Sequence, residues 1–452
     1  MNSELDVTGI ENADILTRDK HTISRKDISP NALKVLYRLL KAGYQAYIVG
    51  GSVRDLLLDK KPKDFDIATN AKPTEIKVLF NNARAIGRRF RIVHIRFGRE
   101  IIEVTTFRAD HNPTSEATEN NAFKDNRESD SVHSEEGMIL RDNVYGNIGE
   151  DAKRRDFTVN ALYYTTDGFR LLDFNHGLQD LKSKKIRIIG DPKERYKEDP
   201  VRMLRAIRFS AKLGFSIEEN TKKPIDELAY LLDSISSARL FDETIKLMTG
   251  GHAVKTFAML REFQLGTFLF APTLEALSEA DTSSTKLVEL ALENTDKRLS
   301  ENKSVTPSFL FAALLWPVFK IHLAESKNLG LTPQLSFEKS AQFAINEQLG
   351  YTAIPRRFTL ATKEIWQLQS KLASRSKKSM KAVFCNSRFR AAYDFLLLRE
   401  ESGEELQGLG QWWTKFQESN ESERDKLILS RSKKKRRFAK TRKPTSHTNS
   451  GS

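Results

Sequence analysis

The chain has 452 residues, 39% of them hydrophobic, and carries a formal net charge of +14. Its length allows a sizeable core and several domains, and its one cysteine, Cys385, excludes a disulfide framework or a thiolate metal cluster. The first 29 residues are polar with six acids, unlike a signal peptide, and no apolar run is long enough to span a membrane. We therefore expect a cytoplasmic protein without a transmembrane segment.

The positive charge is concentrated near the C-terminus. Nine of the thirteen residues from Arg431 to Lys443 are Lys or Arg and no acid follows, so the rest of the chain carries only +5 of the total +14. A block of like charges cannot be buried, which predicts a disordered basic tail over residues 429–452. Such a tail attracts a polyanion through counterion release, and RNA, DNA and anionic lipid all satisfy that requirement.

In chain order, residues 1–30 are predicted to form a polar N-terminal extension, and residues 31–42 a helix that ends at Gly43. Short, β-branched and partly alternating segments then indicate strands, separated by two short helices. The expected strands are 45–49, 65–68, 83–86, 92–97 and 101–107, and the expected helices are 53–58 and 73–80.

Residues 109–137 break this pattern, because the segment 109–136 holds eight acids and almost no apolar residues. We predict a mobile acidic loop there. From Met138 the chain is expected to be mostly helical, apart from a hairpin formed by 169–174 and 186–189. The predicted domains are a head over 31–175, a helical neck over 176–240 and a helical body over 241–428. The fold class is therefore α+β, with a small α/β head followed by an all-helical neck and body.

The first candidate site is the stretch Gly50-Gly51-Ser52-Val53-Arg54-Asp55, placed between a strand and a helix. Paired glycines let the backbone approach a ligand closely, and free N–H groups after them suit a phosphate. Arg54 would add positive charge. Taken alone, the two glycines are better explained as a tight turn.

The second candidate is Asp64-Phe65-Asp66, which opens the expected strand 65–68. Residues i and i+2 of a strand point to the same face, so Asp64 and Asp66 would present two carboxylates side by side. Two adjacent like charges are unfavourable unless a cation binds them. Two Mg²⁺ ions, or Mn²⁺ ions, bridging nucleotide phosphates would satisfy this requirement. An isolated Asp-x-Asp usually consists of solvent-exposed residues without a functional role, but its position after the glycine turn favours the functional interpretation.

A third carboxylate often completes such a site, and two candidates remain open from spacing alone. Glu103 interrupts an apolar strand, where an acid is otherwise unwelcome. Asp156 lies in the segment RRDFTVN, and if that segment is helical, Asp156 and Asn160 share a face.

The last candidate is the segment EDPVRMLRAIRF, in which Arg202, Arg205 and Arg208 recur every three residues. A solvated basic helix face is the simplest interpretation. Alternatively, Asp199 and Arg202 could contact a base edge, since an acceptor beside a donor complements the amino group and N1 of adenine.

These motifs, in this order, resemble the class II nucleotidyltransferase family of bacterial poly(A) polymerases and tRNA CCA-adding enzymes. The matching stretches span roughly Tyr47 to Phe215 and are YIVGGSVRDLLL, KDFDIATNA, EVTTFR, RRDFTVNALYY and EDPVRMLRAIRFSAKLGF. The resemblance implies a palm-like head with a small mixed sheet, in which Asp64 and Asp66 hold the metal ions and Asp156, ranked above Glu103, is the third acid. It also implies nucleotide-binding roles for Gly50, Gly51, Arg54, Arg155, Asn160, Asp199, Arg202 and Arg205.

Within this family, the stretch from Ile86 to Ile95 (IGRRFRIVHI) resembles the pattern of bacterial poly(A) polymerases, as do the helical segment FRAAYDFLLLR and the basic C-terminus. The resemblance therefore implies a template-independent adenylyltransferase that uses ATP, binds RNA 3′ ends through its neck and body, and promotes mRNA processing and decay, as a monomer with RNA-decay proteins as partners. The alternatives are a CCA-adding enzyme and a catalytically inactive RNA-binding adaptor. The intact pair of Asp64 and Asp66 argues against the adaptor. Trp412 and Trp413 are predicted to pack between helices.

Overall fold

The computed structural model describes residues 9–87, 91–109, 131–133, 139–142, 144–279, 282–373 and 377–428. The predicted tail 429–452 and most of the predicted acidic loop 109–137 lie outside these residues. The chain divides into two compact units, Met1–Ser234 and Ile235–Ser452, which are described separately.

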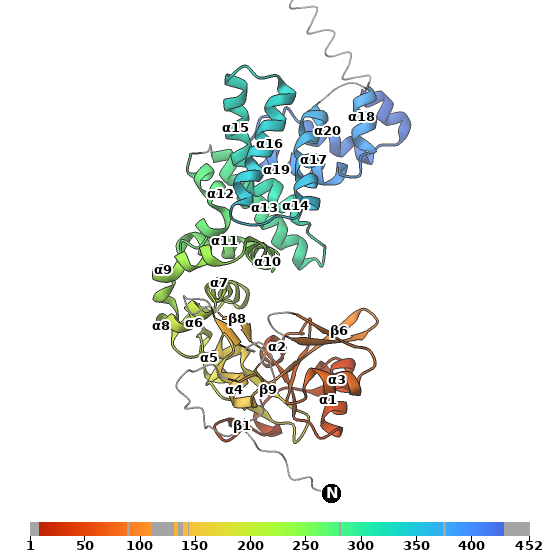
Figure 1. Ribbon diagram of the computed structural model, residues 1–452. Helices are drawn as coiled ribbons and strands as arrows, with labels where there is room; N and C mark the ends of the chain where they lie inside the picture. The colour runs from red at the N-terminus through yellow and green to blue at the C-terminus, as the bar shows by residue number, and fades with distance from the viewer. Residues whose placement is uncertain are drawn as a thin grey trace, which may run out of the picture. The chain divides into compact units, whose positions relative to one another are not determined.

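The first unit is built on an eight-stranded sheet with the strand order β1-β10-β9-β2-β3-β6-β5-β4 (Figure 1). Among the strand pairs of this sheet that the structure describes, β3 and β6 run parallel and the other pairs run antiparallel, so the sheet is mixed as expected. Its strands are β1 Asp14–Leu16, β2 Ala46–Val49, β3 Asp66–Thr69, β4 Ala83–Ile86, β5 Ile92–Phe97, β6 Glu100–Thr106, β9 Leu162–Tyr164 and β10 Leu171–Asp173. Two small sheets pair β7 Ser131–His133 with β8 Ile139–Asp142, and β11 Lys185–Ile186 with β12 Ser216–Ile217.

Helices cover this sheet and continue into the range predicted as the neck, residues 176–240. They are α1 Pro30–Lys41, α2 Gly51–Leu57, α3 Pro73–Leu79, α4 Ile148–Lys153, α5 Gly177–Ser183, α6 Pro192–Glu198, α7 Val201–Leu213, α8 Glu219–Lys222 and α9 Pro224–Leu228. Four 3₁₀ helices accompany them: η1 Arg18–Lys20, η2 Arg25–Asp27, η3 Thr158–Asn160 and η4 Ala229–Ser234.

Strand alternation decides which face of the sheet each residue joins. On one face, Ile67, Val93 and Val104 pack into a core that α1 and α3 also line. On the other face, Val49 and Tyr163 pack in a second core with Ile148 of α4 and residues nearby. Asp66 pairs with Val49 and is therefore on this second face, which carries the candidate site.

The second unit is helical throughout its described elements, as predicted. Its helices are α10 Ser237–Met248, α11 Ala253–Glu262, α12 Thr267–Glu279, α13 Thr282–Ser300, α14 Pro307–Leu314, α15 Trp316–Asn328, α16 Pro333–Leu349, α17 Arg356–Ala373, α18 Lys377–Phe384, α19 Phe389–Glu401 and α20 Leu409–Glu418. Trp413 is buried and donates from its ring nitrogen to the Leu372 carbonyl over 3.1 Å. Trp412 packs on Trp413 and Phe416, so the predicted packing role of this pair is confirmed.

No single described helix is both long and apolar enough to cross a membrane. The helices α14 and α15 would suffice together in length and composition, but they are bent by 51°. Their large side chains, including Phe311, Trp316 and Phe319, are buried inside the unit.

Three local predictions differ from the structure. The hairpin expected between 169–174 and 186–189 is wrong, because β10 pairs with β9 and β11 pairs with β12. β9 lies in a segment expected to be mostly helical, and its continuous apolar sequence LYY is buried, so it shows no alternation. β1 lies within the expected N-terminal extension, yet it pairs with β10 and so belongs to the sheet.

Candidate active site

The glycine turn lies at the end of β2, next to charged side chains from two other elements. Gly50 has φ = 77°, a conformation that an L side chain adopts only with strain. A Cβ added there would lie 3.9 Å from both Asp66 Oδ2 and Arg155 Nη1. The turn predicted from sequence is therefore in close approach to the first strand carboxylate and to a guanidinium.

Asp64 and Asp66 line the same cavity, although the strand begins later than expected. β3 starts at Asp66, so Asp64 lies in the preceding loop and is exposed. Both side chains face a cavity of about 750 Å³ that Lys63 and Glu103 also line. The pair is thus brought together at one opening, as the spacing predicted.

Glu103 is the direct neighbour of Asp66 in the sheet. The two residues are paired across the parallel strands β3 and β6, which puts their side chains on the same face. Burial, followed by the charge of Glu103, raises the pKa of Asp66 to about 6; Asp64 adds to this effect and Arg155 opposes it. The carboxylates therefore repel one another, and a cation between them would relieve that repulsion.

This donor set is suited to Mg²⁺ or Mn²⁺, which prefer oxygen ligands. Among the described residues, no three His, Cys, Asp or Glu side chains are grouped closely enough to hold a metal ion by themselves. Mg²⁺ in proteins is commonly held by one or two carboxylates and completes its coordination with water and substrate phosphate oxygens.

Arg155 is held beside the glycine turn by buried partners. Its Nε donates to the Tyr163 hydroxyl over 2.7 Å and to Asp151 Oδ2 over 3.1 Å. The Tyr163 hydroxyl donates to the same carboxylate oxygen over 2.7 Å. Burial raises the pKa of Tyr163 well above its ordinary value, so this hydroxyl stays protonated and keeps Arg155 in place.

Arg54 lies next to the glycine turn, but its side chain is buried. Its side chain is 2% exposed, and it donates to Asp55 Oδ1 over 2.9 and 2.7 Å and to Asn160 Oδ1 over 2.5 Å. It also lies 5.5 Å from the centre of the Phe209 ring. Arg54 therefore holds Asp55 of α2 and Asn160 in place, and its guanidinium is already hydrogen-bonded to these protein groups.

Asp156 and Asn160 are in contact, but not through a helix. α4 ends at Lys153, and the described chain passes through an extended Phe157 before η3. Asn160 Nδ2 nevertheless donates to Asp156 Oδ1 over 3.3 Å. Asp156 Oδ2 accepts from Arg205 Nε over 2.7 Å, and also from Arg205 Nη2. The segment is therefore not one continuous helix, yet Asp156 and Asn160 are in contact.

Of the predicted base-reading residues, Asp199 lies between α6 and α7, and Arg202 and Arg205 lie on α7. Arg202 Nη1 donates to Glu198 Oε2 over 2.8 Å, and Asp199 Oδ1 accepts from the Val201 N–H over 3.3 Å. Arg195, which sequence reasoning did not select, donates to the Arg155 carbonyl over 2.8 Å. Arg195 thus ties the neck to the backbone of the residue that lies beside the glycine turn.

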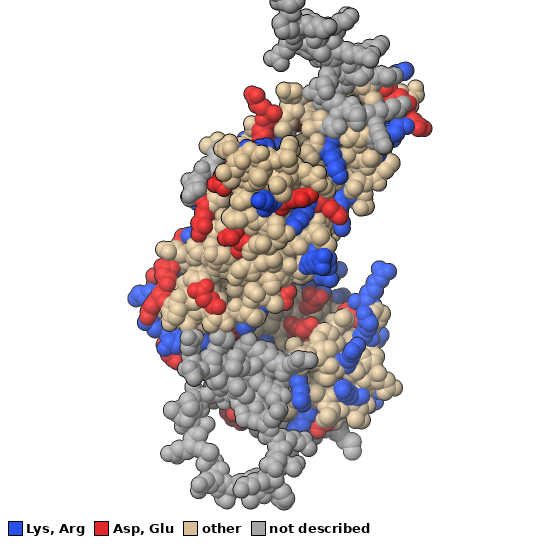
Figure 2. Space-filling view, turned by 45° about the horizontal axis from the view of Figure 1, so that its top comes forward, with Lys and Arg blue, Asp and Glu red and all other residues tan. Residues whose placement is uncertain are grey.

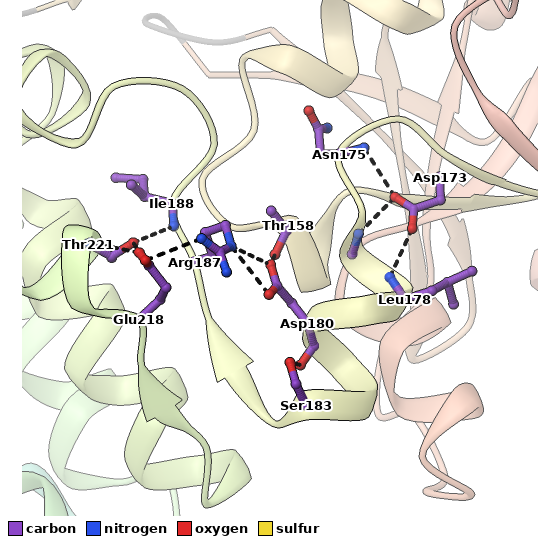
Figure 3. A network of polar contacts seen from close by, with 11 residues as sticks. Thr158, Asp173, Asn175, Leu178, Asp180, Ser183, Arg187, Ile188, Glu218 and Thr221 are labelled. Carbon is purple, nitrogen blue, oxygen red and sulfur yellow. Dashed lines mark hydrogen bonds and ion pairs between the residues drawn. The ribbon is translucent and has the colours of Figure 1, made fainter.

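A further polar network braces this junction (Figure 3). Asp180 Oδ2 accepts from the Thr158 hydroxyl over 2.8 Å and from Arg187 Nε over 3.0 Å. Arg187 also pairs with Glu218 over 3.2 Å, and Glu218 accepts from the Thr221 hydroxyl over 3.0 Å. No motif in the sequence signalled this network, because Thr158, Asp180 and Glu218 lie far apart in the chain.

His94 was also not selected as a site residue, although it lies in the stretch Ile86 to Ile95. Its Nε2 lies 3.2 Å from Glu103 Oε1, on the side of Glu103 away from Asp66. Arg88, Arg89 and Phe90 of the same stretch lie outside the described residues.

Comparison with protein families matches three parts of the chain. Residues 46–187 match the poly A polymerase head domain, residues 214–277 match a probable RNA and SrmB-binding site of polymerase A, and residues 329–447 match the polymerase A arginine-rich C-terminus.

Solved structures share the fold at low sequence identity. The CCA-adding enzyme of Bacillus stearothermophilus in complex with CTP is 24% identical, with a TM-score of 0.53 over 86% of this chain and 82% of that one. A tRNA-processing enzyme in an apo form is 22% identical, with a TM-score of 0.57 over 88% of this chain and 94% of that one.

Curated relatives are more similar. Poly(A) polymerase I of Salmonella typhi is 46% identical over 418 residues, covering 92% of this chain and 88% of the relative. Poly(A) polymerase I of Haemophilus influenzae is 46% identical over 414 residues, covering 90% and 88%. The CCA-adding enzyme of Lactobacillus helveticus is 36% identical over 286 residues, covering 61% and 66%. The chain therefore belongs to the poly(A) polymerase I family.

Proposed function

We propose that this protein is a template-independent polynucleotide adenylyltransferase that adds AMP from ATP to RNA 3′ ends. The observation that carries the proposal is the 46% identity to poly(A) polymerase I over 92% of the chain. The candidate site supports it, because two carboxylates and a tight glycine turn meet at one cavity beside Arg155.

In the proposed reaction, the RNA 3′-hydroxyl oxygen forms a bond to the α-phosphorus of ATP. The bond from that phosphorus to the β-phosphate bridging oxygen breaks, pyrophosphate leaves, and the hydroxyl proton is released. Such a transfer depends mainly on positioning and on charge stabilisation.

Asp64 and Asp66 would hold Mg²⁺, or Mn²⁺, and Glu103 is the carboxylate that the sheet places beside Asp66. When bound, the metal supplies positive charge that favours ionisation of the 3′-hydroxyl and neutralises the leaving pyrophosphate. We therefore assign the third acidic position to Glu103. Asp156, which the resemblance ranked higher, acts through Arg205 and Asn160 as a positioning residue.

The chain's own residues position ATP on the other side of Asp66. The Gly50–Gly51 turn would receive the triphosphate, and Arg155 would contribute positive charge there. Asp199 and Arg202 would select adenine, because a carboxylate acceptor beside a guanidinium donor matches its amino group and N1. Arg54 would act indirectly, by holding α2 and Asn160.

The biological setting is part of the proposal. We propose a cytoplasmic monomer that acts in mRNA processing and decay, with transcripts and RNA-decay proteins as partners. The family match to a probable RNA and SrmB-binding site supports the RNA and protein contacts, and the single cysteine suits a reducing compartment.

Primer extension tests the proposal. Purified protein is incubated with Mg²⁺, a labelled oligo(A) primer and each nucleoside triphosphate separately. The expected result is a long product ladder with ATP alone, abolished in Asp64→Ala and Asp66→Ala. Addition of two or three nucleotides only to a tRNA lacking its 3′ end, with CTP and ATP, would identify a CCA-adding enzyme instead. RNA binding without any incorporation would indicate an adaptor.

A further inference from the structure

A row of four charged or polar side chains crosses the sheet from the candidate site to its edge. Register pairs Asp66 of β3 with Glu103 of β6, Glu103 with His94 of β5, and His94 with Arg84 of β4. Directly paired residues point to the same face of a sheet, so the row extends on the candidate-site side. Three strand spacings separate its ends, about 14 Å.

The residues flanking this row share its face. Ile86 pairs with Ile92, and Arg96 pairs with Ile101. Together with Arg84 and His94 they define the β4–β6 face: Arg84, Ile86, Ile92, His94, Arg96 and Ile101. The alternate residues of the same strands point the other way and are buried in the core that α1 and α3 line.

The β4–β6 face is open and positively charged. Arg84 and Arg96 are exposed, and Ile86 and Ile101 are 38% and 36% exposed. Figure 2 shows Lys and Arg side chains gathered on the side of the first unit where Figure 1 places β6. Exposed isoleucines beside cations are unfavourable in water but suit a ligand that has both phosphates and flat apolar faces.

The side from which the 3′-hydroxyl must approach the nucleotide indicates which ligand binds the β4–β6 face. The glycine turn adjoins Asp66 from the β2 side, whereas Glu103 adjoins it from the β6 side. With the triphosphate on the turn, pyrophosphate leaves toward β2. In-line displacement then brings the attacking 3′-hydroxyl from the β6 side. The nucleotides that precede this hydroxyl must continue over β5 and β4.

We propose that the β4–β6 face is the docking surface for the last nucleotides of the single-stranded RNA primer. Arg84 and Arg96 hold its phosphates, and Ile86 and Ile101 contact its bases. A length of about 14 Å accommodates about two to four nucleotides. The inference rests on the proposed function, which supplies the primer. It also gives a role to part of the stretch from Ile86 to Ile95, which supplies none of the metal-binding carboxylates.

Kinetics of the full chain test the surface. The variant Arg84→Ala/Arg96→Ala is compared with Lys41→Ala/Lys77→Ala, which removes two exposed charges from α1 and α3 on the opposite side of the sheet. We expect the first variant to raise the KM for a short oligo(A) primer about tenfold, while the KM for ATP stays within twofold. The control should leave both values unchanged.

Salt dependence provides an independent readout. Loss of two phosphate contacts should lower the slope of log affinity against log salt by about 1.4 for single-stranded RNA. A primer KM no higher than that of the control variant would overturn the proposal. A raised KM for ATP with an unchanged primer KM would also overturn it, because the face would then serve the nucleotide.

Crosslinking separates this inference from the proposed function. A photoreactive benzoylphenylalanine replaces Ile86 in one variant and Val78, which is 82% exposed on α3, in the other. Labelled oligo(A) should crosslink at position 86 and not at position 78. Crosslinking at 86 by a protein that does not extend the primer would contradict the adenylyltransferase activity alone. Extension without crosslinking at 86 would contradict the docking surface alone.

Discussion

Arg205 and Asp156 are 49 positions apart in the chain, and the guanidinium donates two hydrogen bonds to a single carboxylate oxygen, one of them over 2.7 Å from Nε. Burial raises the pKa of Asp156, but the charge and hydrogen bonds of Arg205 prevail and lower it to about 2. The ion pair therefore fastens α7 of the neck to the segment that carries Arg155 and Asn160.

This ion pair predicts a pH dependence of stability. The pKa of Asp156 is lower in the folded protein than its ordinary value of 3.8, so the pair stabilises the fold above about pH 4 and loses that contribution as the pH falls toward 2. Asp156→Asn should lower the free energy of unfolding by about 2 kcal/mol at pH 7, and by about half as much at pH 3. Urea titrations at both pH values measure this. Asp167→Asn, at a more exposed pair with Arg170, is the control. Equal losses at the two pH values would contradict the assignment.

The crowded carboxylates predict a conflict between activity and stability. Asp66→Asn removes a charge that burial disfavours and that Glu103 and Asp64 repel. The free energy of unfolding of the metal-free variant should therefore rise by about 1 to 3 kcal/mol, and its unfolding temperature should rise with it. The same change should abolish primer extension. Thermal unfolding in a chelator measures the gain, with Asp226→Asn, at an exposed position of α9, as control. A lower unfolding temperature would show that Asp66 stabilises the metal-free fold.

The contact between His94 and Glu103 predicts a metal-dependent defect. His94→Leu leaves Glu103 without the neighbour that lies 3.2 Å away, and should raise the Mg²⁺ concentration for half-maximal activity about tenfold. His94→Gln, whose amide also donates a hydrogen bond, should restore most of this. Metal titrations of both variants at saturating ATP provide the comparison. An identical requirement in His94→Leu and the unaltered protein would remove His94 from the site.

The network at the neck predicts a large loss of stability from one buried side chain. Asp180 is 4% exposed, and Asp180→Ala removes the acceptor of the buried Thr158 hydroxyl and one of the two carboxylates that bind Arg187 (Figure 3). We expect the free energy of unfolding to fall by about 3 kcal/mol. Asp226→Ala should change it by less than about 0.5 kcal/mol. Urea unfolding of the two variants distinguishes these values, and a small effect at Asp180 would mean that the network is not cooperative.

The basic tail predicts a salt-dependent contribution to RNA binding. Deletion of residues 429–452 removes nine positive charges between Arg431 and Lys443. RNA affinity should fall at low salt, and its dependence on salt concentration should become less steep. Binding of the full-length and truncated proteins to the same oligo(A), measured over a range of KCl concentrations, tests this. An unchanged slope would exclude the tail from RNA capture.

Local patterns determined much of the first unit and part of the site. Alternation in the segments 92–97 and 101–107 identified β5 and β6, because one face of each is buried and the other is open. The turn at Gly50 and the pair Asp64 and Asp66 were identifiable from local sequence motifs. Their geometry depends on neighbouring residues in the chain, which the sequence states directly.

Pairing between distant segments decided the rest. Glu103 lies beside Asp66 only because β6 pairs with β3, and Asp156 is bound by Arg205 only because α7 packs against the segment after α4. β9 could not be distinguished from a helix by periodicity, since it is buried on both sides. The sequence by itself determined which residue types were available to the site. Tertiary structure decided which of them meet, because charge pairing and burial depend on distances that chain order does not contain.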